Sequence, residues 1–382
     1  MHHRRSQIMN ASVLPPEWRR YRDPLTDREI LQWTSGESMN HHLYFTNFSV
    51  AGNGRTGYFI SYRTGYPNVF GIDLDSGEIR QLTDRSDMNT YSPVPSLDGS
   101  SLYFSARDCI CRLNSNNGET EVLSVFPGAK LGNCSLSNNN SELAVGVRYS
   151  GFCELAVLDT RSGKTEICHR MDEVGHVQFC PSDENLMLFS GPAGKRLWCH
   201  DRRKVETWRI LEEDPDQWFV HESWLGSGPD IIFVCWPYAL LDVEHDGKNL
   251  RTLSDINAWH PRSDPAGTKI VFDTNHPDRG LYILDLRSKA SRVLCFPGAS
   301  GLGSQWRNDR PADAPGIDTS ILRSEVPEDD VPPRPGDAES LYGPQWTHPH
   351  PSFSPDGKQV VFTSDRDRFS HVYSLSVPIE II

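Results

Sequence analysis

The chain has 382 residues, a formal net charge of −13 and 23% charged residues. This length fits either two ordinary domains or one large all-β ring. No basic stripe compensates the acidic balance, so we expect no nucleic-acid partner, although a local basic or metal cluster can still bind an anionic small molecule.

The N-terminal and cysteine patterns favour a cytoplasmic protein. Met1-His-His-Arg-Arg is followed by no apolar stretch, so we expect no secretory signal. The chain contains no run of about 18 apolar residues, so we also expect no membrane span. The nine cysteines are scattered along the chain, and an odd number of cysteines is typical of proteins whose thiols stay reduced. Cys109 and Cys111 lie in a strand-like run and are better interpreted as core residues than as metal ligands.

A turn followed by a short strand recurs along the chain. The seven copies begin near Ala51, Ser96, Ser137, Pro181, Gly226, Asp264 and Ser354. Their turns are rich in Gly, Asn, Asp and Ser, and the following residues are mostly β-branched, aromatic or aliphatic. A spacing of roughly 40 to 45 residues, without helical periodicity, is typical of propeller blades.

A strand-turn-strand hairpin follows the turns, most clearly at 71–83, 155–167 and 282–294. Two hairpin-linked strand pairs make one four-stranded antiparallel blade. Because a single sheet cannot bury its own faces, the copies must pack against one another. The sequence therefore predicts an all-β protein with a seven-bladed β-propeller.

The ends of the repeat predict how the ring closes. The last copy, 370–377, supplies middle strands only, so we expect an N-terminal strand near 29–33 to complete its blade. This gives an N-terminal extension over 1–28 and a single propeller over 29–382. The segment 304–342 is rich in Pro, Asp and Gly, and we interpret it as an inserted loop, either a lid or a disordered excursion.

Seven histidines precede the repeated turn at similar blade positions. They are His41, His42, His176, His221, His260, His348 and His350. In a propeller, this position is the start of the innermost strand, beside the central channel. We therefore expect these side chains to converge at one end of the axis.

His348 and His350 are candidate metal ligands. In an extended segment, side chains two residues apart leave the same face, and the prolines that follow both histidines keep the backbone extended. Gln345 adds a carboxamide three residues earlier. Imidazole suits a borderline transition metal. The alternative is a pair of ordinary surface histidines on a loop.

Polar residues follow the second strand of several blades. They include Arg63, Lys195, Arg196 and the segment Asn275-His276-Pro277-Asp278. Each alone is most simply an exposed polar residue. Together with the histidines and a metal, they would form a basic mouth suited to an anionic substrate.

Two motifs resemble one known family. Gln345-Trp-Thr-His348-Pro-His350-Pro-Ser-Phe and His221-Glu-Ser-Trp224 are similar to motifs of the oligogalacturonate lyases, which are seven-bladed polysaccharide lyases. The resemblance runs from Tyr44 to the C-terminus. The Ser354-Pro-Asp-Gly repeat also resembles TolB-like propellers. The chain differs from the lyases at 189–192, where they usually carry His-Glu-Gly-Pro.

The resemblance implies a metal-dependent lyase of pectin degradation that converts short uronate oligosaccharides into 4,5-unsaturated products by β-elimination. It implies a divalent metal, typically manganese, bound by His260, Gln345, His348 and His350. It also implies that His221 is the catalytic base and that Arg196 contacts the substrate carboxylate. We further expect substrate contacts from Arg63, His41, His42, His176 and His276.

Two other functions stay open from the sequence. A TolB-like propeller without catalytic activity would use the ring as a protein-binding platform and would need no metal. Another metal-dependent, sugar-active enzyme, such as a hydrolase or epimerase, would keep the metal but produce no unsaturated uronate.

Overall fold

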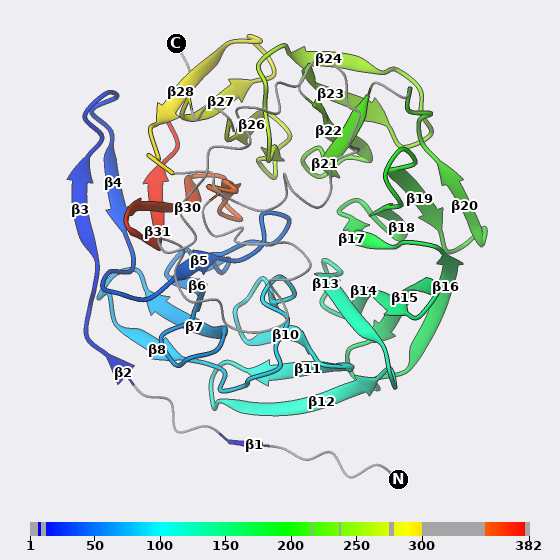
Figure 1. The fold of residues 1–382 in the computed structure, drawn as a ribbon, viewed down its shortest axis with the longest axis horizontal. Coiled ribbons are helices and arrows are strands. Elements are labelled where there is room, and N and C mark those ends of the chain that lie inside the picture. Colours follow the sequence, from blue (N-terminus) through cyan, green and yellow to red (C-terminus); the bar gives the residue numbers. More distant parts are fainter. Residues whose placement is uncertain are drawn as a thin grey trace.

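The computed structural model describes residues 7–8, 13–214, 217–236, 238–274, 279–299 and 348–378. Seven antiparallel sheets surround one axis (Figure 1). The expected all-β, seven-bladed propeller is confirmed. Within the described ranges, no helix has the length and apolarity needed to cross a bilayer. The predicted inserted loop, Gln345 and His276 lie outside the described residues.

The blades are numbered along the chain, and their strands are given from the axis outwards (Figure 1). Blade 1 contains β5 (Asn40–His42), β6 (Thr56–Ser61), β7 (Asn68–Asp73) and β8 (Ile79–Gln81). Blade 2 contains β9 (Val94–Pro95), β10 (Ser101–Ala106), β11 (Cys109–Asn114) and β12 (Glu119–Val125). Blade 3 contains β13 (Lys130–Leu136), β14 (Glu142–Tyr149), β15 (Phe152–Asp159) and β16 (Thr165–Met171). Blade 4 contains β17 (Gly175–Cys180), β18 (Asp183–Ser190), β19 (Leu197–Asp201) and β20 (Glu206–Arg209).

The remaining blades follow the same order. Blade 5 contains β21 (Trp218–Trp224), β22 (Asp230–Trp236), β23 (Ala239–Glu244) and β24 (Arg251–Ser254). Blade 6 contains β25 (Arg262–Ser263), β26 (Lys269–Phe272), β27 (Leu281–Asp285) and β28 (Ser291–Cys295). Blade 7 contains β29 (Ser352–Phe353), β30 (Gln359–Asp367), β31 (Phe369–Ser376), β4 (Glu29–Gln32) and β3 (Arg19–Arg22).

An N-terminal strand closes the ring, as the sequence predicted. Strand β4 pairs with β31 in blade 7, and the buried Trp33 then donates from Nε1 to Ser374 Oγ at 2.9 Å. Three blades have a fifth strand, because β3 pairs with β4, β2 (Val13–Leu14) with β8, and β1 (Gln7–Ile8) with β12. These strands cover outer edges that would otherwise expose unpaired backbone groups.

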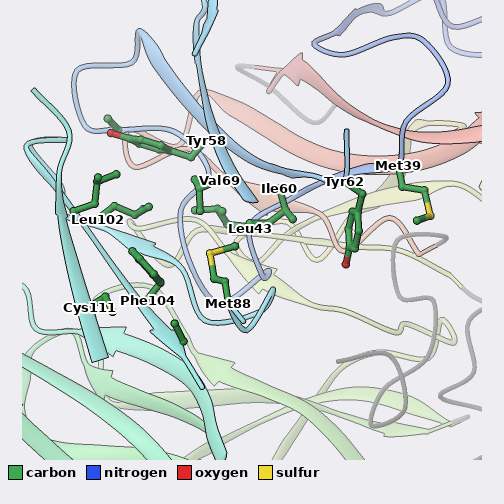
Figure 2. Packing of buried hydrophobic residues seen from close by; sticks show 13 residues of the cluster. Met39, Leu43, Tyr58, Ile60, Tyr62, Val69, Met88, Leu102, Phe104 and Cys111 are labelled. Carbon is green, nitrogen blue, oxygen red and sulfur yellow. The ribbon is translucent and has the colours of Figure 1, made fainter. Parts of the chain in front are cut away.

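The hydrophobic core lies between neighbouring blades. Figure 2 shows the cluster in which Tyr58 and Ile60 of blade 1 meet Leu102 and Phe104 of blade 2. Because a neighbour covers each face of a blade, the middle strands are buried on both faces and read as continuous apolar runs. This packing fixes the starts of the innermost strands, where the candidate site lies.

Candidate active site

Three of the predicted metal ligands converge. The ligand atoms of His260, His348 and His350 all lie within 4.8 Å of one another, and all three side chains are buried. The ring centroids of His260 and His350 are 3.7 Å apart, and each is 5.7 Å from His348. Blades 6 and 7 thus bring together residues that are far apart in the sequence.

The carboxylate of Asp273 accepts hydrogen bonds from two of these three histidines and orients them. It accepts bonds from His260 Nδ1 at 2.8 Å, from the His260 backbone N–H at 2.7 Å and from the His350 backbone N–H at 3.2 Å. His350 Nδ1 donates to the His348 carbonyl at 3.1 Å. Both histidines therefore carry their proton on Nδ1 and leave the lone pair on Nε2.

The Nε2 atoms of His260 and His350 are buried and have no hydrogen-bond partner within the described part of the chain. Buried polar atoms are normally satisfied, so this pair of acceptors needs an explanation. A divalent cation between the rings would supply one. The donor set fits a borderline divalent transition metal, for which neutral imidazole is a suitable ligand.

His221 lies beside this cluster against an aromatic wall. Its ring centroid is 4.3 Å from that of His260 and 4.4 Å from that of Trp259. Among the described residues, neither nitrogen of His221 has a hydrogen-bond partner. Burial, together with the neighbouring His260 and His176, holds the pKa of His221 well below its usual range. The imidazole is therefore neutral and carries a lone pair on one of its nitrogens.

Arg196, Glu222 and His176 form a connected network next to His221. Arg196 Nε donates to Glu222 Oε2 at 3.2 Å, and His176 Nδ1 lies 3.3 Å from Glu222 Oε1. Burial raises the pKa of Glu222, but Arg196 and His176 outweigh it and lower that pKa to about 2. Tyr44 extends the network, with its hydroxyl 2.9 Å from His176 Nε2.

Backbone irregularities aim the histidines at the axis. His176, His221 and His350 have φ values of 47°, 56° and 47°, in the left-handed region. The pairing register shifts between Gly175 and Gln178, and again between Val220 and Ser223. A bulge re-aims a side chain that a regular strand would point elsewhere, and such strained residues cluster at functional sites.

Phe45 fills the centre of the histidine group. It is fully buried, and its ring centroid lies between 5.5 and 6.5 Å from those of His176, His221, His260 and His350. These histidines belong to four consecutive blades. Phe45 therefore lies close to the axis and forms the floor of the site.

His41 and His42 are buried near the site and bonded to the protein. His41 Nε2 lies 3.0 Å from Thr90 Oγ1, and His42 Nε2 donates to the Pro349 carbonyl at 3.2 Å. His42 thus supports the backbone between the two predicted metal ligands of blade 7. Arg63 forms an ion pair with Glu17 at 2.7 Å, and it also donates to Ser61 and Asn40. Direct substrate contacts of these three residues stay predictions, as does that of His276.

Sequence reasoning missed a groove next to His176. Tyr44, Tyr91, Lys130, Arg148 and His176 are among the residues lining this pocket of about 80 Å³. Lys130 and Arg148 are paired across β13 and β14. Lys130 begins an innermost strand, so a search of that position for any polar residue, rather than for histidine alone, would have found it.

Comparisons with known proteins found relatives that match nearly the whole chain. No family model matches the chain. It is 24% identical to the oligogalacturonate lyase of Dickeya dadantii, over 94% of this chain and 95% of that protein. It is also 24% identical to the oligogalacturonide lyase of Pectobacterium atrosepticum, over 97% and 99% of the two chains.

Two solved structures share the fold. A structure of oligogalacturonate lyase in complex with manganese has a TM-score of 0.79 and 19% identity, covering 97% of this chain and 98% of that one. An oligogalacturonate lyase from Vibrio parahaemolyticus has the same TM-score and identity, with 97% and 99% covered. The resemblance seen in the sequence motifs is confirmed along nearly the whole chain.

Proposed function

We propose that this protein is a lyase that cleaves short galacturonate oligosaccharides by β-elimination and uses a divalent metal, most simply Mn²⁺. The observation that carries the proposal is the convergence of His260, His348 and His350 beside the unpartnered, neutral imidazole of His221. The two lyase relatives and the manganese-bound structural neighbour support the same reaction and metal.

His260, His348 and His350 would hold the metal, and Gln345 is the proposed fourth ligand. When bound, the metal acts as a Lewis acid that neutralises the uronate carboxylate and stabilises the negative charge that develops next to it. The three imidazoles also suit other divalent transition metals, so the metal requirement must be tested with a panel.

His221 is the proposed base. The proton on C5 of a uronate is a poor acid beside an ionised carboxylate, and a neutral imidazole is an apt acceptor for it. As His221 takes this proton, the C5–H electrons form the C4=C5 double bond and the C4–O4 bond breaks. This elimination yields a 4,5-unsaturated product, and the departing oxygen takes up a proton from solvent.

Arg196 and the groove are proposed to hold the sugar acid. Arg196 is bonded to Glu222, but about a fifth of its side chain stays exposed. Lys130 and Arg148 place two further cations along the groove that begins at His176, and Arg148 also forms an ion pair with Glu173 at 3.5 Å. On a chain with net charge −13, this local positive charge suits an anionic oligosaccharide. All nine cysteines are free thiols, which supports a proposed cytoplasmic location.

The test is the ultraviolet absorbance of the conjugated product, followed with purified protein, manganese and a panel of short uronate oligomers. We expect a rising signal that chelator abolishes and that His221→Ala lowers by at least about 100-fold, as expected for loss of a general base. His245→Ala is the matched control, because His245 lies in the same blade and its backbone carbonyl, rather than its ring, accepts the Trp208 bond.

Three results would redirect the assignment. Wild-type turnover in His221→Ala would contradict its role as the base. A flat signal with bound metal would indicate another sugar-active reaction. A flat signal without bound metal would favour a binding platform.

A further inference from the structure

A second cavity lies on the axis at the end opposite the histidines. The histidines stand at the starts of the innermost strands, whereas this cavity is lined by residues at the ends of those strands and in the turns that follow. All seven blades contribute to it, and its volume is about 980 Å³. The segment 44–48 separates the two ends, because Tyr44 and Phe45 face the histidines while Thr46 and Phe48 line the cavity.

Arg262 presents a cation to this cavity. It lies two residues after His260 and is therefore further from the histidine end of the channel. Its guanidinium carbon is 5.9 Å from the centroid of the Phe48 ring. Within the described ranges, the guanidinium has no ion pair or hydrogen bond. An arginine stays charged at neutral pH, so this cation has no direct partner there, although carboxylates line the same cavity.

Thr46 adds an independent observation. Its side chain is only 8% exposed, it lines the cavity, and its Oγ1 has no hydrogen-bond partner among the described residues. A buried hydroxyl normally finds a partner. Thr46 supplies a hydroxyl group, Arg262 supplies a bidentate donor, and Phe48 adds the apolar face of its ring.

The mouth of the cavity limits the charge of its ligand. Asp98, Asp264 and Asp356 line it, and their carboxylates accept bonds within their own turns from Ser96, Thr268 and Ser354. These negative charges repel a multiply charged anion. They can still accept hydrogen bonds from the hydroxyl groups of a ligand that carries a single carboxylate.

We propose that this cavity binds a monomeric sugar acid, with its carboxylate on Arg262, its ring against Phe48 and its hydroxyl groups directed to Thr46 and the carboxylates at the mouth. The guanidinium matches a carboxylate in a bidentate geometry. The site is separate from the proposed lyase site and does not depend on that reaction.

Calorimetric titration of the full-length, manganese-loaded protein with galacturonate tests this proposal. The Arg196→Gln background weakens sugar-acid binding at the histidine end, and the loss on further replacing Arg262 or Thr46 identifies the part of the remaining binding that belongs to the second cavity. There we expect galacturonate to bind, and Arg262→Gln to weaken binding by about tenfold or more through loss of a charge-assisted pair. Thr46→Val, which keeps the side-chain shape, should weaken binding by about fivefold.

Galactose and inorganic phosphate are the matched probes for the two halves of the ligand. We expect neither to bind as tightly as galacturonate, because galactose lacks the carboxylate and phosphate lacks the hydroxylated ring. Equal binding of phosphate would overturn the ligand class. If galacturonate binding survives both Arg262→Gln and Thr46→Val in the Arg196→Gln background, or if Arg196→Gln alone abolishes it, the site itself is refuted.

Discussion

Replacing Asp273 by asparagine tests whether the carboxylate behind the histidines prepares them for a metal. Three donors point at the two oxygens of Asp273, namely the Nδ1 and backbone N–H of His260 and the backbone N–H of His350. Asparagine keeps one acceptor oxygen and presents an NH₂ group in place of the other. If the remaining oxygen stays with His260, the His350 N–H faces a donor.

Leaving one such buried group unsatisfied costs about 1–3 kcal/mol. If this cost destabilises the arrangement of His260 and His350 that binds metal, the affinity for manganese falls by about 10- to 100-fold. This range is typical when a residue that orients a metal ligand is replaced. The assay is manganese affinity measured against a competing chelator. Asp242→Asn is the matched control, because Asp242 is equally buried and pairs with Arg251 on the outer strands of blade 5.

The reasoning is refuted if the Asp273→Asn protein stays folded and binds manganese as tightly as the wild type. It is also refuted if Asp242→Asn weakens manganese binding to the same extent. In that case, the loss would reflect general destabilisation rather than the orientation of His260.

Two further predictions concern stability. Because the folded pKa of Glu222 is about 2 and its ordinary value is 4.5, its charge stabilises the fold above pH 4.5, and this stabilisation is lost as the pH falls towards 2. Urea unfolding should therefore show that the wild type is more stable than Glu222→Gln by up to about 3 kcal/mol at pH 7, and that this difference narrows by about 1 kcal/mol at pH 3.5. A difference that does not change with pH would contradict this. Since His176 has a left-handed backbone, His176→Gly should be more stable than His176→Ala by about 1 kcal/mol, and equal stabilities would count against backbone strain there.

The repeat made much of the architecture predictable. Turn residues and strand-forming residues are local signals, and their spacing along the sequence is enough to define the blades. The missing outer strand of the last copy also predicted closure by β4. The added strands β1, β2 and β3 were not foreseen, because they are short and their pairing depends on edges that exist only after the ring has formed.

The candidate site was predictable where it followed the repeat. The histidines at the starts of innermost strands converge because the ring places equivalent positions around one axis. Arg63 shows the limit of that reasoning, since it follows a strand as expected but is paired with Glu17, which lies 46 residues earlier in the chain. The role of Phe45 had no sequence signal, because the segment after β5 is irregular and its course depends on contacts with distant blades.

The position of Phe45 has a consequence for how the proposed substrate reaches the histidines. The fully buried ring occupies the middle of the histidine group, and Asn47 ties the same segment to blades 2 and 3 through the carbonyls of Pro93 and Cys134. An aromatic ring held in this way separates the predicted metal ligands from the large cavity at the other end of the axis. Among the described residues, the groove at His176, where Lys130 and Arg148 lie, is on the histidine side of Phe45, and we expect the proposed substrate to approach from there.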